Sequence, residues 1–183
     1  MNVAIIGASG YTGLELIKIL INHPKFNITY IANSSGEMNV QDLHPCLKNV
    51  LNIDVSLADA SQVAKVADLA FLALPHKTAM AFAKELLDLG VKVIDLSADY
   101  RLELETYEKH YCEHIDKEHI KDAVYGLPEY FRDEIKNAKL IANPGCYPTA
   151  SLLALLPFID YIDIDAPIFI DAKSGVSGAG KNP

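Results

Sequence analysis

Short apolar runs alternate along the chain with longer stretches in which apolar residues recur every three or four positions. The runs are almost continuously hydrophobic, which is typical of parallel strands that are covered on both faces. The longer stretches, residues 12–22 and 77–89, have the spacing of helices, and Gly90 stands where a left-handed C-terminal cap is usual. We expect strands at residues 3–6, 28–32, 69–74, 91–96, 140–142 and 168–170.

Strand, helix and strand follow one another in rotation. This order predicts an α/β fold, with a doubly wound, Rossmann-type, mostly parallel sheet. Residues 101–132 interrupt the rotation, because they are rich in Glu, Lys, His and Tyr and carry a helical patch at 103–111. We interpret them as an insertion at the edge of the sheet. We assign residues 1–145 to the Rossmann-type domain and residues 146–183 to the start of a second domain.

The composition narrows the class of protein. Half of the 183 residues are hydrophobic and 22% are charged, which predicts a folded chain, and the net charge of -8 argues against a general nucleic-acid binder. No apolar stretch approaches the roughly 20 residues that span a bilayer, and the N-terminus does not resemble a secretory signal. The three cysteines, Cys46, Cys112 and Cys146, form neither an even framework nor a metal-type spacing. We therefore expect a cytoplasmic protein with reduced thiols and no metal.

A glycine-rich turn stands between the first predicted strand and the first predicted helix. Glycines at this spacing permit a tight turn, a close approach of backbone N–H groups to a pyrophosphate, and close packing of the helix on the strand. The phosphates then lie at the helix N-terminus. The turn predicts a dinucleotide site, with a tight turn that binds nothing as the alternative. The candidate residues are Gly7, Ser9, Gly10, Tyr11, Thr12 and Gly13.

The end of the second predicted strand indicates which cofactor is bound. Binders of NAD usually place Asp or Glu there, to hold the ribose 2′-hydroxyl. This chain instead has Asn33, Ser34, Ser35 and Gly36. Hydroxyls and backbone N–H groups can hold the 2′-phosphate of NADP, whereas a carboxylate would repel it. We predict NADP with Ser34 and Ser35 as ligands, although Glu37 lies close by and a serine-rich loop without a ligand is the alternative.

A second turn, residues 143–149, carries Cys146 between a predicted strand and an apolar helix at 150–156. A cysteine near a helix N-terminus is favoured as thiolate, and the free N–H groups there can stabilise an oxyanion. Pro148 suits the first turn of the helix. Cys146 is therefore a candidate nucleophile, and the alternative is a small apolar residue buried at a turn.

With these two turns, three further segments make the chain resemble N-acetyl-γ-glutamyl-phosphate reductases along its whole length. The segment Pro144 to Thr149 is the most specific part of the resemblance. The resemblance implies NADPH-dependent reduction of N-acetyl-γ-glutamyl phosphate to N-acetylglutamate 5-semialdehyde and phosphate, in arginine biosynthesis. It also implies an α+β substrate and dimerisation domain after residue 145 and a homo-oligomer at full length. The further segments are residues 95–102, 125–129 and 171–180.

The resemblance also implies roles for single residues. The thiolate of Cys146 would attack the acyl phosphate and expel phosphate, and hydride would reduce the thioester. Arg101 and Asn143 would hold the substrate. A guanidinium can bind a carboxylate bidentately, although an anchoring arginine is the alternative for Arg101. The residues expected beside the cofactor are Pro75, Ser174 and Gly175.

Several alternatives stay open on the sequence. A lysine-pathway acyl-phosphate reductase is close to the resemblance, an aspartate-semialdehyde dehydrogenase less so, and a non-catalytic dinucleotide-binding module would use the same fold. Members of the resembled family are longer and place a general-acid histidine downstream of the cysteine. Here all six histidines precede Cys146. We therefore expect the chain to be a fragment that cannot turn over the full reaction by itself.

Overall fold

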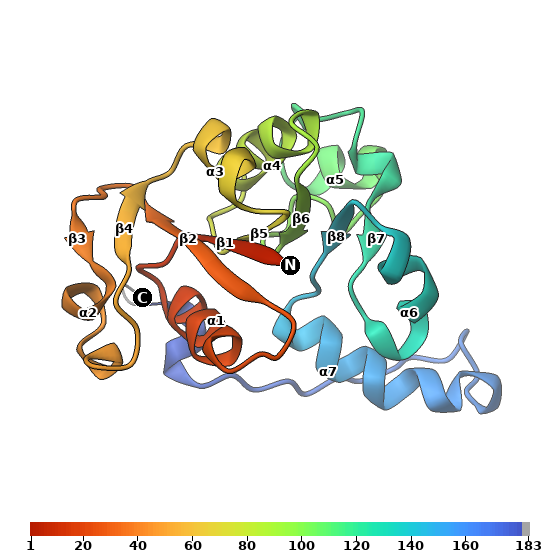
Figure 1. The fold of residues 1–183 in the computed structure, drawn as a ribbon. Coiled ribbons are helices and arrows are strands. Elements are labelled where there is room, and N and C mark those ends of the chain that lie inside the picture. The colour runs from red at the N-terminus through yellow and green to blue at the C-terminus, as the bar shows by residue number, and fades with distance from the viewer. Residues whose placement is uncertain (181–183) are drawn as a thin grey trace.

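The computed structural model describes residues 1–180, which form an eight-stranded sheet in the order β3-β4-β2-β1-β5-β6-β8-β7 (Figure 1). Neighbouring strands are parallel, except that β3 is antiparallel to β4. Without β3 and β7 the order is the 3-2-1-4-5-6 of dinucleotide-binding folds. The strands are β1 (Asn2–Ile6), β2 (Asn27–Asn33), β3 (Met38–Asn39), β4 (Asp54–Leu57), β5 (Leu69–Leu72), β6 (Lys92–Asp95), β7 (Val124–Tyr125) and β8 (Leu140–Ala142).

The helices lie on both faces of the sheet (Figure 1), with α1 on one face and α3 and α4 on the other. The helices are α1 (Tyr11–Ile21), α2 (Val40–Leu43), α3 (Ala60–Val66), α4 (Thr78–Asp88), α5 (Leu104–His110), α6 (Pro128–Asn137) and α7 (Cys146–Leu155). Four 3₁₀ turns accompany them: η1 (Pro45–Leu47), η2 (Ile120–Asp122), η3 (Leu156–Tyr161) and η4 (Val176–Ala179).

The central strands are buried on both faces, which explains their continuous hydrophobicity. In β1, Val3 and Ile5 pack into the core beside α1, whereas Ala4 and Ile6 pack into the core beside α3 and α4. All four residues are completely buried. Because successive side chains of a strand point to opposite faces, two cores require apolar residues at every position.

Five of the six predicted strands are confirmed, within one or two residues at their ends, and so are the helices at 12–22 and 77–89. Gly90 adopts the expected left-handed conformation, with φ +83. The strand predicted at 168–170 is wrong: this segment is extended but unpaired within residues 1–180, and Phe169 is 94% exposed. A strand needs a neighbour to accept and donate its backbone hydrogen bonds.

The polar segment 101–132 does lie at the edge of the sheet, and it supplies the edge strand itself. It contains α5, η2 and the short strand β7, which pairs with β8 in parallel. The prediction of a helical patch at 103–111 agrees with α5. The two-residue strand β7 was not predicted, because so short an element leaves no periodic signal.

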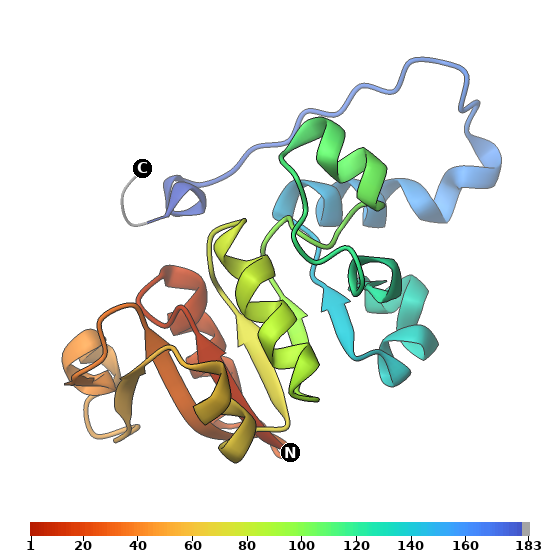
Figure 2. The same cartoon turned by 90° about the horizontal axis from the view of Figure 1, so that it is seen from above.

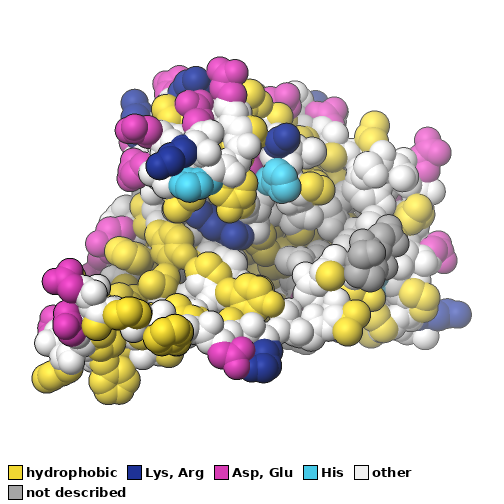
Figure 3. All heavy atoms as spheres, turned by 180° about the vertical axis from the view of Figure 1, so that it is seen from behind, with side chains coloured by type: hydrophobic (Ala, Val, Ile, Leu, Met, Phe, Trp, Pro, Cys, Tyr) yellow, Lys and Arg dark blue, Asp and Glu magenta, His cyan; other side chains and the backbone are white. Residues whose placement is uncertain are grey.

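After α7 the chain turns back and runs along the outside of the molecule (Figure 2). None of the described residues beyond Pro144 is buried, and every residue from 163 to 180 is exposed. Hydrophobic side chains gather on this part of the surface (Figure 3), among them Phe158, Tyr161 and Phe169. Such a patch is typical of a surface that another folded unit covers. None of the helices in residues 1–180 has the length and apolar character that crossing a membrane requires.

Candidate active site

Four loops meet at the carboxyl ends of β1, β5, β6 and β8, which are neighbours in the sheet. Hydrogen bonds continue the ladder past the strand ends: Ala73 N–H donates to Ile6 O at 2.8 Å, and Leu96 N–H to Leu72 O at 3.0 Å. The loops that follow these strands, from residues 7, 73, 96 and 143, therefore stand side by side. In doubly wound folds, ligands bind at this edge, where the strand order reverses.

The glycine turn follows β1 and closes against the end of β5. A Cβ built on Gly7 would lie 2.2 Å from Ala73 O, and Gly7 has φ +91. A Cβ on Gly13 would lie 2.6 Å from Gly7 O and 2.7 Å from Ala8 Cα. Both positions therefore exclude any side chain. Gly10 differs, because the nearest atom to its Cβ position is 3.9 Å away and the space beside it is open.

Helix α1 begins at this turn with an uncapped N-terminus. Its N-cap is Gly10, no side chain of residues 1–180 caps it, and its first turn contains no acidic residue. The N–H groups of Tyr11, Thr12 and Gly13 belong to the first turn, where a helix offers no internal acceptor. Free N–H groups and the helix dipole together make this a place for an anion.

Two buried polar side chains brace the glycine turn. Asn33 Nδ2 donates to Ser9 Oγ at 3.0 Å, while its Oδ1 accepts from the N–H groups of Ser35 (2.9 Å) and Gly36 (2.6 Å). His44 Nε2 donates to Ala8 O at 2.7 Å. Asn33 thus shapes the serine loop and ties it to the glycine turn, and Ser34 and Ser35 are left exposed. Sequence reasoning missed His44, because nothing in its neighbourhood marks it as a partner of Ala8.

Cys146 is the first residue of α7, and its side chain is exposed. The N-cap is Gly145, the described residues supply no side-chain cap, and the first turn contains no acidic residue. The N–H groups at the start of α7 and the helix dipole therefore favour a negative charge beside the sulfur. The exposure rules out the alternative in which Cys146 is a small apolar residue buried at a turn.

Arg101 ties the loop after β6 to the loop that leads to Cys146. Its Nε donates to Asn143 O and its Nη2 to Leu96 O, both at 2.8 Å. A Cβ on Gly145 would lie 3.1 Å from Nη1 of the same guanidinium, so glycine gives Arg101 room there. The Nε–Nη2 edge is thus occupied by backbone carbonyls. Nη1 and the second hydrogen of Nη2 are the donors left for a ligand.

Asp95 ends β6 beneath these loops and is completely buried. It accepts hydrogen bonds from Ser97 N–H at 3.1 Å and from the Ser97 hydroxyl at 2.6 Å. Burial raises the pKa of this carboxyl from 3.8 to about 6, and it outweighs the hydrogen bonds from Ser97, which lower the pKa. The buried carboxyl orients Ser97 at the base of the loop.

This raised pKa predicts a pH-dependent stability. The contribution of Asp95 is fully present below its unfolded pKa of 3.8 and is lost as the pH rises through about 6. The shift corresponds to about 3 kcal/mol. Urea unfolding of the wild type and Asp95→Asn at pH 4 and pH 7 measures it. We expect the wild type to lose up to about 3 kcal/mol relative to the variant between the two pH values. A difference that does not change with pH would contradict the assignment.

The other expected site residues are less closely placed. Pro75 is exposed in the loop after β5, at the same edge as the glycine turn. Asn143 lies in the loop after β8, and its Nδ2 donates to Pro144 O at 3.1 Å. Ser174 and Gly175 are exposed in the segment outside the sheet, and no described atom lies within 4 Å of a Cβ built on Gly175. A role for Ser174 and Gly175 beside the cofactor stays a prediction.

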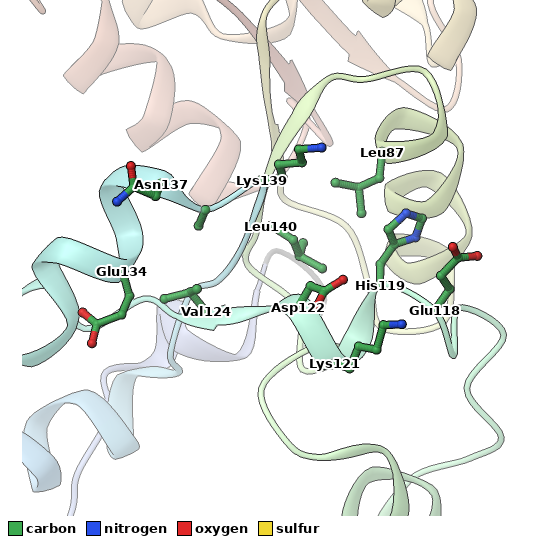
Figure 4. A pocket seen from close by; sticks show the side chains of 11 residues that line it. Leu87, Glu118, His119, Lys121, Asp122, Val124, Glu134, Asn137, Lys139 and Leu140 are labelled. Atoms are coloured by element: carbon green, nitrogen blue, oxygen red, sulfur yellow. The ribbon is translucent and has the colours of Figure 1, made fainter.

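A cavity of about 570 Å³ lies away from these loops, where β7 and β8 begin (Figure 4). Its lining contains charged side chains of both signs, namely Lys121, Lys139, Glu118, Asp122 and Glu134. It opens at the amino ends of the strands, opposite to the glycine turn and Cys146. Across residues 1–180, no group of three or more His, Cys, Asp or Glu side chains is placed to hold a metal ion.

Comparison with known proteins identifies relatives of both parts of the chain. The profile of the semialdehyde dehydrogenase NAD-binding domain matches residues 2–138, and that of the semialdehyde dehydrogenase dimerisation domain matches residues 146–183. N-acetyl-gamma-glutamyl-phosphate reductases from Sulfurovum sp. and Wolinella succinogenes are 61% and 60% identical to this chain. The matches cover 99% and 98% of this chain and 54% and 53% of those proteins. The chain therefore spans about half the length of the curated relatives it matches, and the resemblance drawn from its motifs is confirmed.

Solved structures of the same fold come from a more distant group. Aspartate semialdehyde dehydrogenase II from Vibrio cholerae, complexed with ASA, has a TM-score of 0.65 at 22% identity, over 98% of this chain and 48% of that one. Aspartate semialdehyde dehydrogenase with NADP from Candida albicans has a TM-score of 0.64 at 20% identity, over 87% of this chain and 47% of that one. At such identities the likeness shows the fold alone, and it agrees with the doubly wound sheet.

Proposed function

The chain belongs to the semialdehyde dehydrogenase family, and we propose on that premise that it carries the NADP site and the catalytic thiol of an N-acetyl-γ-glutamyl-phosphate reductase. The observation that carries the proposal is the position of Cys146. It is exposed at the uncapped start of α7, and the loop before it follows β8, at the same carboxyl edge of the sheet as the glycine turn. The identity of about 60% to N-acetyl-gamma-glutamyl-phosphate reductases supports this substrate over that of a lysine-pathway or aspartate-semialdehyde enzyme.

The glycine turn fits a dinucleotide. Gly7 and Gly13 allow the turn to close, and the open space beside Gly10 leaves room for a pyrophosphate over the N–H groups of α1. The chemistry that NADPH supplies when bound is hydride transfer. The N–H groups at the start of α1 would hold its phosphates, and the serine loop would face the ribose.

The thiol chemistry follows from the start of α7. The thiolate of Cys146 attacks the acyl carbon, the C–O bond to phosphate breaks, and phosphate leaves with the electron pair. The N–H groups at the helix start stabilise the oxyanion of the tetrahedral intermediate. The product is a thioester on Cys146, and thiolate leaves again once the acyl group has been reduced.

Arg101 and Asn143 are proposed to hold the substrate from the neighbouring loops. The free hydrogens of Arg101, on Nη1 and Nη2, can bind an anionic oxygen end-on. The bonds to Leu96 and Asn143 fix the guanidinium in place before the substrate arrives. Arg101 would therefore act both as an anchor of the Cys146 loop and as an anion ligand, so the two readings of Arg101 do not exclude each other.

The serine loop predicts a preference for NADP(H) over NAD(H). Ser34→Asp places a carboxylate where the 2′-phosphate would lie, so we expect it to weaken NADPH binding and to reverse the preference. Fluorescence titration of both reduced cofactors into the chain measures this. Ser34→Asn is the matched control, because it has nearly the same shape without the charge. Tighter binding of NADH than NADPH by the wild type would contradict the preference.

Alkylation separates the enzyme from a non-catalytic dinucleotide-binding module. Cys46 and Cys146 are both exposed, so a difference in rate between them reports chemistry rather than access. We expect iodoacetamide to modify Cys146 at least about tenfold faster than Cys46 near neutral pH, because the uncapped N–H groups at the start of α7 surround the sulfur of Cys146 and not that of Cys46. Peptide mass spectrometry over time measures both rates. Equal rates would favour the non-catalytic module.

We also propose that the whole protein is a homo-oligomer. The support is the match of residues 146–183 to a dimerisation domain, together with the exposed apolar surface that begins with α7. A cytoplasmic location stays a prediction from the cysteine content, and a reduced compartment suits a mechanism that needs a free thiol.

A further inference from the structure

Asp99 is a completely buried carboxylate in the loop between β6 and α5. Burial of a carboxylate is costly unless hydrogen-bond donors replace the lost water. Asp99 Oδ2 accepts from Lys77 N–H at 2.8 Å and from Met80 N–H at 3.0 Å, and Oδ1 accepts from the Tyr107 hydroxyl at 2.7 Å. Two of these three donors belong to the start of α4, 22 and 19 residues away along the chain.

These contacts make Asp99 the cap of α4, supplied from another loop. The N-cap residue of α4 is Lys77, and its own side chain makes no capping bond in the described structure. Lys77 also has φ +70, a left-handed conformation that is unfavourable for any residue with a Cβ. The bond from its N–H to a buried carboxylate holds it there. The turn that links β5 to α4 is therefore set by Asp99.

This turn borders the cofactor edge. It begins at Ala73, whose carbonyl oxygen faces the place where Gly7 excludes a Cβ, and it contains Pro75. A shift of this turn would move the backbone against which the glycine turn packs. The turn after β5 thus lies beside the glycine turn and the free N–H groups of α1, at the carboxyl ends of two neighbouring strands.

Asp99 is itself fixed by its own loop. Its N–H donates to Ser97 Oγ at 3.0 Å, and the Ser97 hydroxyl donates to Asp95 at 2.6 Å. Two residues further on, Arg101 binds the carbonyls of Leu96 and Asn143. The loop after β6 therefore makes hydrogen bonds to both neighbouring loops. Asp99 binds the turn after β5, and Arg101 binds the loop before Cys146.

We infer that Asp99 is a positioning residue, which holds the Pro75–Lys77 turn in the conformation that binds the cofactor. The inference rests on the proposed function, because it takes NADP(H) as the ligand of this edge. Asp99 is completely buried, so it offers no surface to a cofactor or substrate. It acts through the backbone N–H groups of Lys77 and Met80. Its loss should therefore lower the affinity for NADP(H) and leave the reactivity of the Cys146 thiol unchanged.

The test is titration of NADPH into the chain, with thermal unfolding measured on the same samples. Asp99→Ala removes the acceptor for both N–H groups, and we expect NADPH to bind about tenfold more weakly, since 1.4 kcal/mol corresponds to a factor of ten. Asp99→Asn keeps one oxygen that can accept from both, so it should bind within about threefold of the wild type. Tyr107→Phe removes the third donor alone, and it should lower the unfolding temperature without changing NADPH affinity.

Lys77→Gly extends the test to the conformation of the turn. Glycine adopts the left-handed conformation without strain, so Asp99→Ala should weaken NADPH binding less in this background than in the wild type.

Asp99→Ser can accept from one N–H group only, and it replaces the alanine variant if that one does not fold. Unchanged NADPH affinity in Asp99→Ala or Asp99→Ser, or a loss in Asp99→Asn as large as in alanine, would overturn the inference. Failure of the wild type itself to bind NADPH would instead overturn the proposed function, and this inference with it.

Discussion

Replacing Cys146 with serine is expected to lower turnover of N-acetyl-γ-glutamyl phosphate by the whole protein about 10⁴-fold or more. Removal of a covalent nucleophile has effects of this size, because the two-step route through an acyl-enzyme is lost. A hydroxyl at the start of α7 is far less nucleophilic than a thiolate, although it has nearly the same shape. Steady-state NADPH oxidation with the acyl phosphate measures the loss.

Two controls make this result specific. Cys46→Ser changes a second exposed thiol outside the site, and it should retain the turnover of the wild type. The Cys146→Ser variant should still bind NADPH with the affinity of the wild type, since the glycine turn is untouched. A Cys146→Ser enzyme that keeps more than about a tenth of the activity would place the chemistry on another residue.

Two alanine substitutions in the glycine turn are expected to have unequal effects on stability but the same effect on NADPH binding. Gly13→Ala puts a Cβ within 3 Å of backbone atoms of Gly7 and Ala8, so it should lower the free energy of unfolding by about 1–3 kcal/mol. Gly10→Ala meets no atom closer than 3.9 Å and has an ordinary φ of -78. Its stability should stay within about 1 kcal/mol of the wild type.

Both variants should nevertheless bind NADPH at least about tenfold more weakly. In Gly13→Ala the turn is displaced, whereas in Gly10→Ala the methyl group takes the space that a pyrophosphate needs above the start of α1. Urea unfolding gives the stabilities and fluorescence titration the affinities. The informative variant is Gly10→Ala: if it is stable and binds NADPH like the wild type, the phosphates do not lie on the glycine turn.

The sequence predicted the parts of the fold that local chemistry determines. Buried central strands must be apolar at every position, so β1 and β5 were visible as continuous runs. The glycine turn was visible because Gly7 and Gly13 admit no side chain. β4 was not predicted, because Asp54–Leu57 lies near the edge, where only alternate positions need to be apolar. The segment 168–170 has the composition of a strand, but its pairing depends on partners that local sequence does not reveal.

The site residues that belong to local motifs were also predictable from the sequence, whereas those that act through long-range hydrogen bonds were not. Cys146 was found because a cysteine after Gly145 at a helix start is a local pattern. In the structure its side chain is exposed. The roles of Asp99 and His44 depend on hydrogen bonds to backbone groups many residues away, so they leave no periodic or motif-like signal. For Arg101 the sequence offered two roles, and the structure adds two backbone carbonyls as partners of its guanidinium.

The most direct test of the proposed function is a search for the acyl group on Cys146. The whole protein is mixed with N-acetyl-γ-glutamyl phosphate in the absence of NADPH, and its peptides are examined by mass spectrometry while released phosphate is measured. We predict one N-acetylglutamyl group per chain on Cys146, one equivalent of phosphate, and loss of the adduct as aldehyde when NADPH is added. Absence of an adduct under conditions of normal turnover, or an adduct on Cys46 or Cys112 instead, would contradict the account.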